Sequence, residues 1–255
     1  MTKTILRAQG VGMTFGTGAT AVDAIGKIDI DLREGEILGL VGPSGCGKTT
    51  LFNIITGLLK PTRGMVTVDQ SENSPGVGYM LQKDMLLPWR SVLDNVLLGL
   101  EVRGVPRQKS EAIALELIRA YGLAGFESAK PSTLSGGMRQ RVAIMRTLAF
   151  DPSVVLLDEP FSALDFQTRS LLQEDVARII AERQKAAILI THDIGEAITM
   201  CDRILVLTHR PSRILREIVV DIPRDQRDPV GIRKTPLYNE YFVRIWEDLE
   251  NKVPA

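Results

Sequence analysis

The chain has 255 residues, 44% of them hydrophobic and 24% charged, without a low-complexity tract. This composition is typical of a globular protein and fits one large domain, or one domain with a subdomain. The 31 basic and 31 acidic side chains give a formal net charge of zero. This balance argues against a protein whose main task is to coat nucleic acid, although a local basic groove is still allowed.

The two cysteines, Cys46 and Cys201, suggest no disulfide framework, so we expect a reducing, cytoplasmic setting. The N-terminal residues lack the apolar core of a signal peptide. No apolar stretch approaches the roughly 18 residues that a membrane span needs. We therefore expect a soluble chain, which leaves attachment to a membrane protein open.

The first third of the chain shows strand patterns around one helix. Residues 27–32 alternate polar and apolar side chains, as in a half-buried strand, whereas 36–42 are apolar throughout, as in a strand covered on both faces. A helical pattern begins at Lys48, and Pro61 and Gly64 mark a turn. The strands expected here are residues 27–32, 36–42, 65–69 and 77–81.

The middle of the chain, residues 83–150, is predicted to be an all-helical insertion. Ser91 and Asp94 favour a helix start close to a capping box, and Gly104 and Pro106 separate two segments with helical spacing. A further helix follows the sequence LSGGMRQR. The helices expected here are residues 91–102, 108–123 and 142–150.

Strand and helix patterns alternate again after residue 150, which predicts a mostly parallel α/β sheet. The tail adds one more strand and a helix with Thr235 as N-cap and Pro236 at its first position. Its apolar side chains favour a helix packed on the domain; they are Leu237, Tyr241, Phe242, Ile245, Trp246 and Leu249. The elements expected here are strands 154–158, 186–190, 203–207 and 213–222 and helices 170–184 and 235–250.

Residues 42–49, GPSGCGKT, match the phosphate-binding P-loop pattern G-x-x-x-x-G-K-[ST], with a strand before and a helix after it. The glycines let the backbone wrap around a phosphate with its N–H groups inward, and the helix N-terminus adds favourable potential. Lys48 is expected to reach the β- and γ-phosphates, and the Thr49 hydroxyl to bind Mg²⁺. The predicted nucleotide contacts are Gly42, Pro43, Ser44, Gly45, Cys46, Gly47, Lys48, Thr49 and Thr50.

Two acidic residues, Asp158 and Glu159, end the apolar strand VVLLD, at the sheet edge where α/β proteins bind ligands. Because side chains alternate along a strand, the two carboxylates are expected to do different work. Asp158 is the candidate for the Mg²⁺ shell, and Glu159 for polarising an attacking water. Gln82 follows strand 77–81 and has an amide that can reach Mg²⁺ or that water.

Each of the two histidines lies just after a predicted strand. His192 follows strand 186–190 at the carboxyl edge of the sheet and is a further catalytic candidate, whereas His209 lies in a turn and is interpreted as structural. Cys46 is interpreted as filler between the required glycines.

The glycine pair in LSGGMRQR supplies a second anion site, because a helix start with exposed N–H groups and a nearby hydroxyl binds anions. Ser135, Gly136 and Gly137 provide those groups. Two such helix starts in one chain can be halves of a single site if two copies meet head to tail.

Together these segments resemble the ATP-binding cassette (ABC) ATPases over about residues 4–210, with all motifs in family order. The resemblance implies an α/β P-loop NTPase cassette with a mostly parallel core sheet, N-terminal antiparallel strands and an inserted all-helical subdomain. It implies one ABC ATPase domain over 1–255. Its parts are a nucleotide-binding core (1–82 and 151–210), a helical subdomain with the signature (83–150) and a C-terminal extension (211–255).

The resemblance also implies that two cassettes enclose two ATPs with Mg²⁺, each between the P-loop of one copy and the LSGG segment of the other. Glu159 is then the general base, His192 a γ-phosphate contact and Asp165, in SALD, a dimer contact. Phe15 matches the position of an adenine-stacking aromatic, with core packing as the alternative. The family signature usually ends LSGGQ, whereas Met138 stands here; the phosphate contacts come from Ser135 and the glycines, so we expect activity to survive.

The resemblance further implies an ATPase that drives a separate membrane permease from the cytoplasmic face of the membrane. The segments LPWRSVLDNV, DEPFSALD and HRPSRI look most like the nitrate, sulfonate and taurine importers, which receive solute from an extracytoplasmic binding protein. Trp89 is a candidate permease contact, with burial inside the cassette as the alternative. No nucleic acid partner is expected. Rival interpretations are an exporter or lipid-transport cassette, an ABC ATPase acting on nucleic acid or ribosomes, and a regulatory module with little turnover.

Overall fold

The computed structural model describes residues 3–69, 76–162 and 164–250, so Ala163 of the SALD segment lies outside the described residues. Nine strands in the described ranges form one sheet in the order β4-β1-β2-β9-β8-β3-β7-β6-β5. The strands are β1 (Thr4–Phe15), β2 (Val22–Arg33), β3 (Ile37–Val41), β4 (Arg63–Val68), β5 (Val77–Met80), β6 (Val154–Asp158), β7 (Ala186–Thr191), β8 (Arg203–Leu207) and β9 (Ser212–Val219).

Seven α-helices accompany these strands in the described residues. They are α1 (Lys48–Ile55), α2 (Val92–Val102), α3 (Arg107–Ala120), α4 (Gly136–Leu148), α5 (Phe166–Glu182), α6 (Ile194–Met200) and α7 (Pro236–Glu250). None of them combines the length and the hydrophobicity that a membrane span requires. Helix α6 and strand β1 were not among the individually predicted elements.

The central strands β8, β3, β7, β6 and β5 run parallel to one another. Every residue of β3, β6 and β7 is buried, as expected of strands covered on both faces. The registers pair Val41 with Thr191, Asp158 with Ile190, and Met80 with Leu157. Strands β3, β5, β6 and β7 therefore end at one edge of the sheet, which brings the segments after them together.

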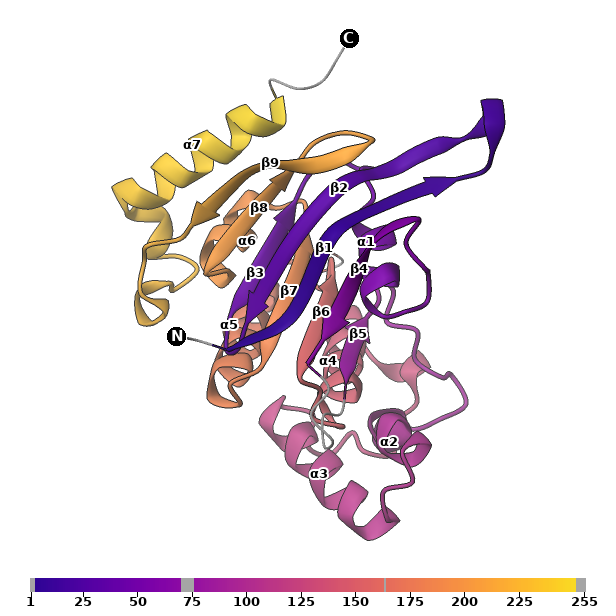
Figure 1. Cartoon of the computed structure of the whole chain (residues 1–255). Coiled ribbons are helices and arrows are strands. Elements are labelled where there is room, and N and C mark those ends of the chain that lie inside the picture. Colours follow the sequence, from indigo (N-terminus) through magenta and orange to yellow (C-terminus); the bar gives the residue numbers. More distant parts are fainter. Residues whose placement is uncertain (1–2, 70–75, 163, 251–255) are drawn as a thin grey trace.

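The N-terminal strands β1, β2 and β4 are antiparallel, as predicted, and the β1–β2 hairpin extends beyond the rest of the sheet (Figure 1). Strand β9 joins the two parts, because it is parallel to β2 and antiparallel to β8. The expected strand 27–32 is part of the longer β2, and its exposed and buried residues alternate as predicted. The sheet is thus continuous from the hairpin to the parallel core.

Helices α2, α3 and α4 lie between β5 and β6 in the chain; in Figure 1, α2 and α3 lie below the sheet and α4 lies next to β5. The Ser91 hydroxyl accepts from the Asp94 backbone N–H at the start of α2, as the capping-box pattern predicts. Side chains such as Val96, Leu117 and Ile144 pack into one apolar cluster shared with β6 and β7. The insertion is therefore anchored on the sheet by a common core.

The C-terminal helix α7 packs against α6 and lies along β8 and β9 (Figure 1). Thr235 caps it, because its hydroxyl accepts from the Tyr238 N–H. The expectation that Trp246 belongs to the buried face is wrong: its side chain is 52% exposed, and its indole N–H donates to Glu250 instead. Tyr238, which the periodicity did not single out, is buried in its place.

Candidate functional site: the P-loop edge of the sheet

The P-loop follows β3 and turns into α1 at Gly47, whose φ of 108° is in the left-handed region. A Cβ at Gly47 would lie 3.2 Å from the Ala24 carbonyl oxygen, so conformation and space both favour glycine there. The buried Lys48 ammonium donates to the carbonyl oxygens of Gly42 (2.7 Å) and Pro43 (3.0 Å). The loop thus folds around its own lysine.

A cavity of about 410 Å³ opens over this loop. Most of its lining comes from segments that follow β3, β5 and β6, and it brings together most of the residues predicted from separate motifs. The lining residues are Ser44, Gly45, Gly47, Lys48, Thr49, Thr50, Gln82, Asp158, Glu159, Ile190 and Arg210. Cys46 is buried behind the loop, where burial raises the pKa of its thiol; this agrees with a filler role.

Asp158 and Thr49 supply two oxygen atoms at the floor of the cavity. The Thr49 hydroxyl donates to the Asp158 carboxylate over 3.1 Å, and the Tyr79 hydroxyl donates to the same oxygen over 3.3 Å. Burial raises the pKa of Asp158, and these two hydrogen bonds oppose that shift. The described residues contain no group of three or more His, Cys, Asp or Glu side chains that could hold a metal ion. The oxygen atoms of Thr49 and Asp158 fit Mg²⁺, which uses one or two protein oxygens together with phosphate oxygens and water.

Glu159 directly follows the last residue of β6 and has contacts that differ from those of Asp158. Its φ of 46° is left-handed, which is uncommon for a residue with a side chain. One carboxylate oxygen accepts a 2.9 Å hydrogen bond from the Gln82 amide and lies 3.4 Å from Nδ1 of His192. The side chains of Gln82, Glu159 and His192 therefore meet at one point beside the cavity.

The LSGG segment lies in a second cavity of about 330 Å³, separate from the P-loop cavity. Ser135 caps α4, with its hydroxyl accepting from the Met138 N–H. A Cβ on Gly137 would lie 2.9 Å from the Thr168 methyl group of α5, whereas one on Gly136 would lie 4.0 Å from its nearest neighbour, Nη2 of Arg139. The lining residues are Ser135, Gly136, Gly137, Met138, Arg141, Leu164, Asp165 and Thr168.

The model of the ABC transporter family matches residues 25–162. The chain belongs to the ABC transporter family. A Methanocaldococcus jannaschii ABC transporter ATP-binding protein, itself uncharacterized, is 44% identical over 98% of this chain and 93% of its own length. The taurine import ATP-binding protein TauB of Rhizobium johnstonii is 43% identical over 86% of each chain.

The cassette fold is also that of solved structures. The dimeric ATP-binding cassette MJ0796, in a post-hydrolysis state with ADP and Pi, shares 30% sequence identity and a TM-score of 0.74, over 86% of this chain and all of that one. This protein is therefore an ABC cassette, the ATP-binding subunit of an ABC transporter and an ATPase. The expected fold, with its parallel core and N-terminal antiparallel strands, is confirmed.

Two aromatic candidates of the cassette lie at the surface. Phe15, at the end of β1, is 40% exposed and is not part of the lining of the P-loop cavity. Trp89 is 70% exposed, so burial inside the cassette is the wrong alternative for this residue. Half-buried His209 lies between β8 and β9, and its neighbour Thr208 donates to its carbonyl oxygen.

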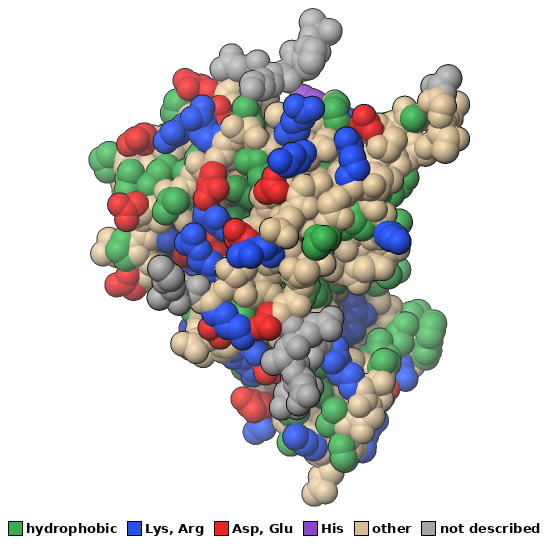
Figure 2. All heavy atoms as spheres, in the orientation of Figure 1, with side chains coloured by type: hydrophobic (Ala, Val, Ile, Leu, Met, Phe, Trp, Pro, Cys, Tyr) green, Lys and Arg blue, Asp and Glu red, His purple; other side chains and the backbone are tan. Residues whose placement is uncertain are grey.

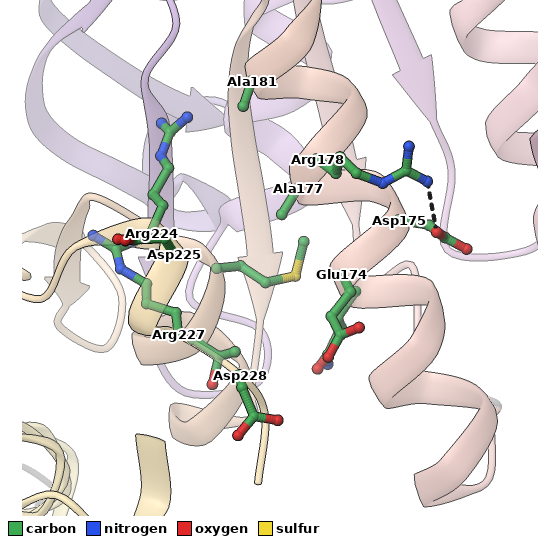
Figure 3. A pocket seen from close by; sticks show the side chains of 12 residues that line it. Glu174, Asp175, Ala177, Arg178, Ala181, Arg224, Asp225, Arg227 and Asp228 are labelled. Atoms are coloured by element: carbon green, nitrogen blue, oxygen red, sulfur yellow. Dashed lines mark hydrogen bonds and ion pairs between the residues drawn. The ribbon is translucent and has the colours of Figure 1, made fainter. Parts of the chain in front are cut away.

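A further cavity of about 430 Å³ lies between α5, the end of α6 and residues 224–228 (Figure 3). Its arginines already have partners. Arg178 pairs with Asp175, Arg224 pairs with Asp202, and Arg227 donates to the carbonyl oxygens of Cys201 and Ile222. These contacts satisfy the positive charges within the fold, so we do not place a phosphate ligand there.

The sequence interpretation missed Arg210, which lines the P-loop cavity, and Tyr79, which contacts the lining residue Asp158. Tyr79 lies on β5 and reaches Asp158, as described above. Arg210 lies in the turn between β8 and β9, and its guanidinium is 3.2 Å from the position of a Cβ on Gly45. The positions of both side chains depend on strands that are adjacent in the sheet but distant in the chain. No local sequence pattern therefore predicts their contacts.

Proposed function

We propose that this cassette is the ATP-hydrolysing subunit of a solute importer. Two copies pair head to tail around two ATPs, and closing and reopening of the pair drives a separate permease at the cytoplasmic face of the membrane. The observation that carries the proposal is the separation of the two anion sites within one chain. Ser135–Gly137 and the P-loop open into different cavities, so one nucleotide contacts both only if a second copy supplies one of them.

The residue roles follow from the geometry of the P-loop cavity. The P-loop amides and Lys48 hold the phosphates, while the stretch from Gly42 to Thr50 forms the cradle. Thr49, Asp158 and Gln82 hold Mg²⁺, which supplies charge neutralisation to the phosphate oxygens when bound. Phe15, exposed at the end of β1, is the proposed adenine contact.

Glu159 is the proposed general base of the hydrolysis. Its carboxylate accepts the proton of the attacking water, and the contacts from Gln82 and His192 hold it in place. His192 is 63% exposed at its side chain, so it is also accessible as the γ-phosphate contact. Two groups thus fix one carboxylate oxygen while the other oxygen remains for the water.

The import direction and a small anionic or related solute are supported by the relatives. One is named as a taurine import protein, and the bicarbonate transport ATP-binding protein CmpC of Synechococcus elongatus is 42% identical over 83% of this chain and 33% of its own length. The exposed Trp89 in the helical part is the proposed permease contact. Positive and negative side chains are interspersed over the face in Figure 2, which does not favour a nucleic acid partner for that face.

The shared-site proposal is tested by Ser135→Arg in a Glu159→Gln background. A bulky cation at the cap of α4 should block closure while ATP binding by the monomer is kept. Light scattering with and without ATP measures the dimer, and the same Ser135→Arg change in the parent chain measures hydrolysis. Ser128→Arg, at an exposed position of the same helical part, is the matched control.

A Ser135→Arg variant that dimerises and hydrolyses ATP as the parent does would remove the shared site from the proposal. The importer assignment is tested by purifying the native complex and identifying its membrane subunit. An exporter or lipid-transport permease, or a ribosome or DNA in place of a permease, would contradict it.

A further inference from the structure

The C-terminal extension contacts the start of α5, next to the segment that carries Asp165. Arg233 lies in the single helical turn Ile232–Lys234 that precedes α7. Its guanidinium carbon lies 5.2 Å from the centre of the Phe166 ring, which is within the range of a cation–π contact. Phe166 is the first residue of α5 and directly follows Asp165. One residue of the extension is therefore fixed to the element that positions the proposed dimer contact.

The same extension contacts the segment that carries His192. Gly195 in α6 allows close packing, because a Cβ there would lie 2.8 Å from the Tyr238 hydroxyl and 3.4 Å from Nη2 of Arg233. Tyr238 is buried in α7, and α6 and α7 pack along each other. Since α6 begins two residues after His192, the extension rests on the helix that fixes this histidine.

Arg169 joins the two segments from inside. Its guanidinium donates to the Leu164 carbonyl oxygen over 2.9 Å and to the Asp193 carboxylate over 3.3 Å. Leu164 precedes Asp165, and Asp193 follows His192. Arg169 thus bridges the segments that carry the two residues, and Arg233 lies next to Phe166 and Gly195 of the helices that follow them.

The contact between Arg233 and Phe166 is at the surface. The Phe166 side chain is 54% exposed and Arg233 is also exposed, so this pair adds little to the core. A surface contact of this kind fixes the relative position of the two side chains but contributes little to the stability of the fold. In contrast, the buried Tyr238 belongs to the core and fixes the extension in place.

From these contacts we propose that Arg233 and Tyr238 are positioning residues for ATP hydrolysis. They hold the segments of Asp165 and His192 in one fixed relation, so that Asp165 meets the paired copy while His192 stays beside Glu159 at the γ-phosphate. The C-terminal extension then contributes to ATP hydrolysis and does not only pack against the domain. The inference rests on the proposed function, because Asp165 and His192 act only when two copies close around ATP.

The test compares Arg233→Ala, Phe166→Leu and the double variant by steady-state ATPase kinetics on the full chain. We expect kcat to fall about threefold to tenfold with KM for ATP unchanged, because the P-loop is untouched. The double variant should be no slower than the slower single variant. Arg233→Lys, which keeps a cation over the ring, should recover most of the rate. Arg244→Ala removes the same charge from an exposed position of α7 and is the matched control.

Tyr238→Phe keeps the ring, removes the hydroxyl above Gly195 and is expected to lower kcat about twofold to threefold. Circular dichroism and thermal unfolding check that each variant is folded. ATP-dependent dimerisation of the Arg233→Ala/Glu159→Gln chain should need several-fold more ATP than that of Glu159→Gln alone. A folded Arg233→Ala chain with parental kcat, or one that changes only KM, would overturn the inference.

The two proposals fail in different ways. If Ser135→Arg blocks closure while Arg233→Ala keeps the parental kcat, only the positioning role is wrong. If Ser135→Arg hydrolyses ATP normally, the shared site is wrong, whatever Arg233→Ala does.

Discussion

The Gln82 amide donates a 2.9 Å hydrogen bond to the Glu159 carboxylate, although 77 residues separate them in the chain. The two residues follow the adjacent parallel strands β5 and β6, and His192 follows β7, the next strand in the sheet. The sheet edge therefore places an amide, a carboxylate and an imidazole around one point. This arrangement supports Glu159 as the general base of hydrolysis, and mutation of its carboxylate tests that role.

Glu159→Gln should reduce the rate of ATP hydrolysis by a factor of roughly 10² to 10⁴, the usual contribution of a general base. Glutamine has nearly the same shape but does not accept a proton from water at neutral pH. The dissociation constant for ATP should change little, because the P-loop and Asp158 remain. Phosphate release and nucleotide titration measure the two quantities, with Glu116→Gln on the exposed side of α3 as control. An unchanged hydrolysis rate would favour a different base.

The sequence predicts the P-loop, Asp158, Glu159 and the LSGG segment because each belongs to a short contiguous motif whose residue types explain its chemistry. Their meeting at one edge follows from the parallel order of the strands. The N-terminal strand β1 is harder to predict, because glycines at positions 10 and 12 interrupt its alternation. The structure shows register shifts between Ala8 and Val11 and between Val11 and Met13, where the strand bulges.

Burial of the helices is less predictable than their existence. Helix α6 has only seven residues, all buried, so it shows no amphipathic period. In α7 the apolar stripe is wider than the buried face. Tyr241 and Ile245 are buried, whereas Trp246 stacks on Phe242 at a centroid distance of 6.3 Å and stays half exposed. Only the position of the neighbouring elements decides which part of such a stripe is covered.

Arg210→Ala should weaken ATP binding by about twofold to tenfold. The Arg210 guanidinium lines the P-loop cavity beside Gly45, where it adds positive charge near the phosphates. Because this residue is exposed, its contribution should fall as salt is raised from 50 to 500 mM. Titration with a fluorescent ATP analogue at both salt concentrations measures the effect. Arg213→Ala, near the start of β9 and outside the cavity, is the control; equal loss in both variants would mean a general charge effect.

Glu196→Gln should make the stability of the protein less dependent on pH. Glu196 is 6% exposed, one carboxylate oxygen accepts from the Thr191 hydroxyl over 2.8 Å, and the other has no hydrogen-bond partner within the described ranges. Burial raises the pKa of this carboxyl from 4.5 to about 8. Between these two values the folded chain keeps a proton that the unfolded chain loses. The free energy of unfolding therefore falls as the pH rises through this window, by at most about 1.4 kcal/mol per pH unit.

Glutamine removes this dependence, because it stays neutral in both states and still accepts the Thr191 hydrogen bond. Relative to the parent, Glu196→Gln should gain Tm as the pH rises from 5 to 8, by about 2 to 4 °C for each kcal/mol. Thermal unfolding at pH 5, 6.5 and 8 measures this gain, with Glu240→Gln on the exposed side of α7 as control. A Tm difference between parent and Glu196→Gln that is the same at all three pH values would show that the folded Glu196 carboxyl ionises at an ordinary pH.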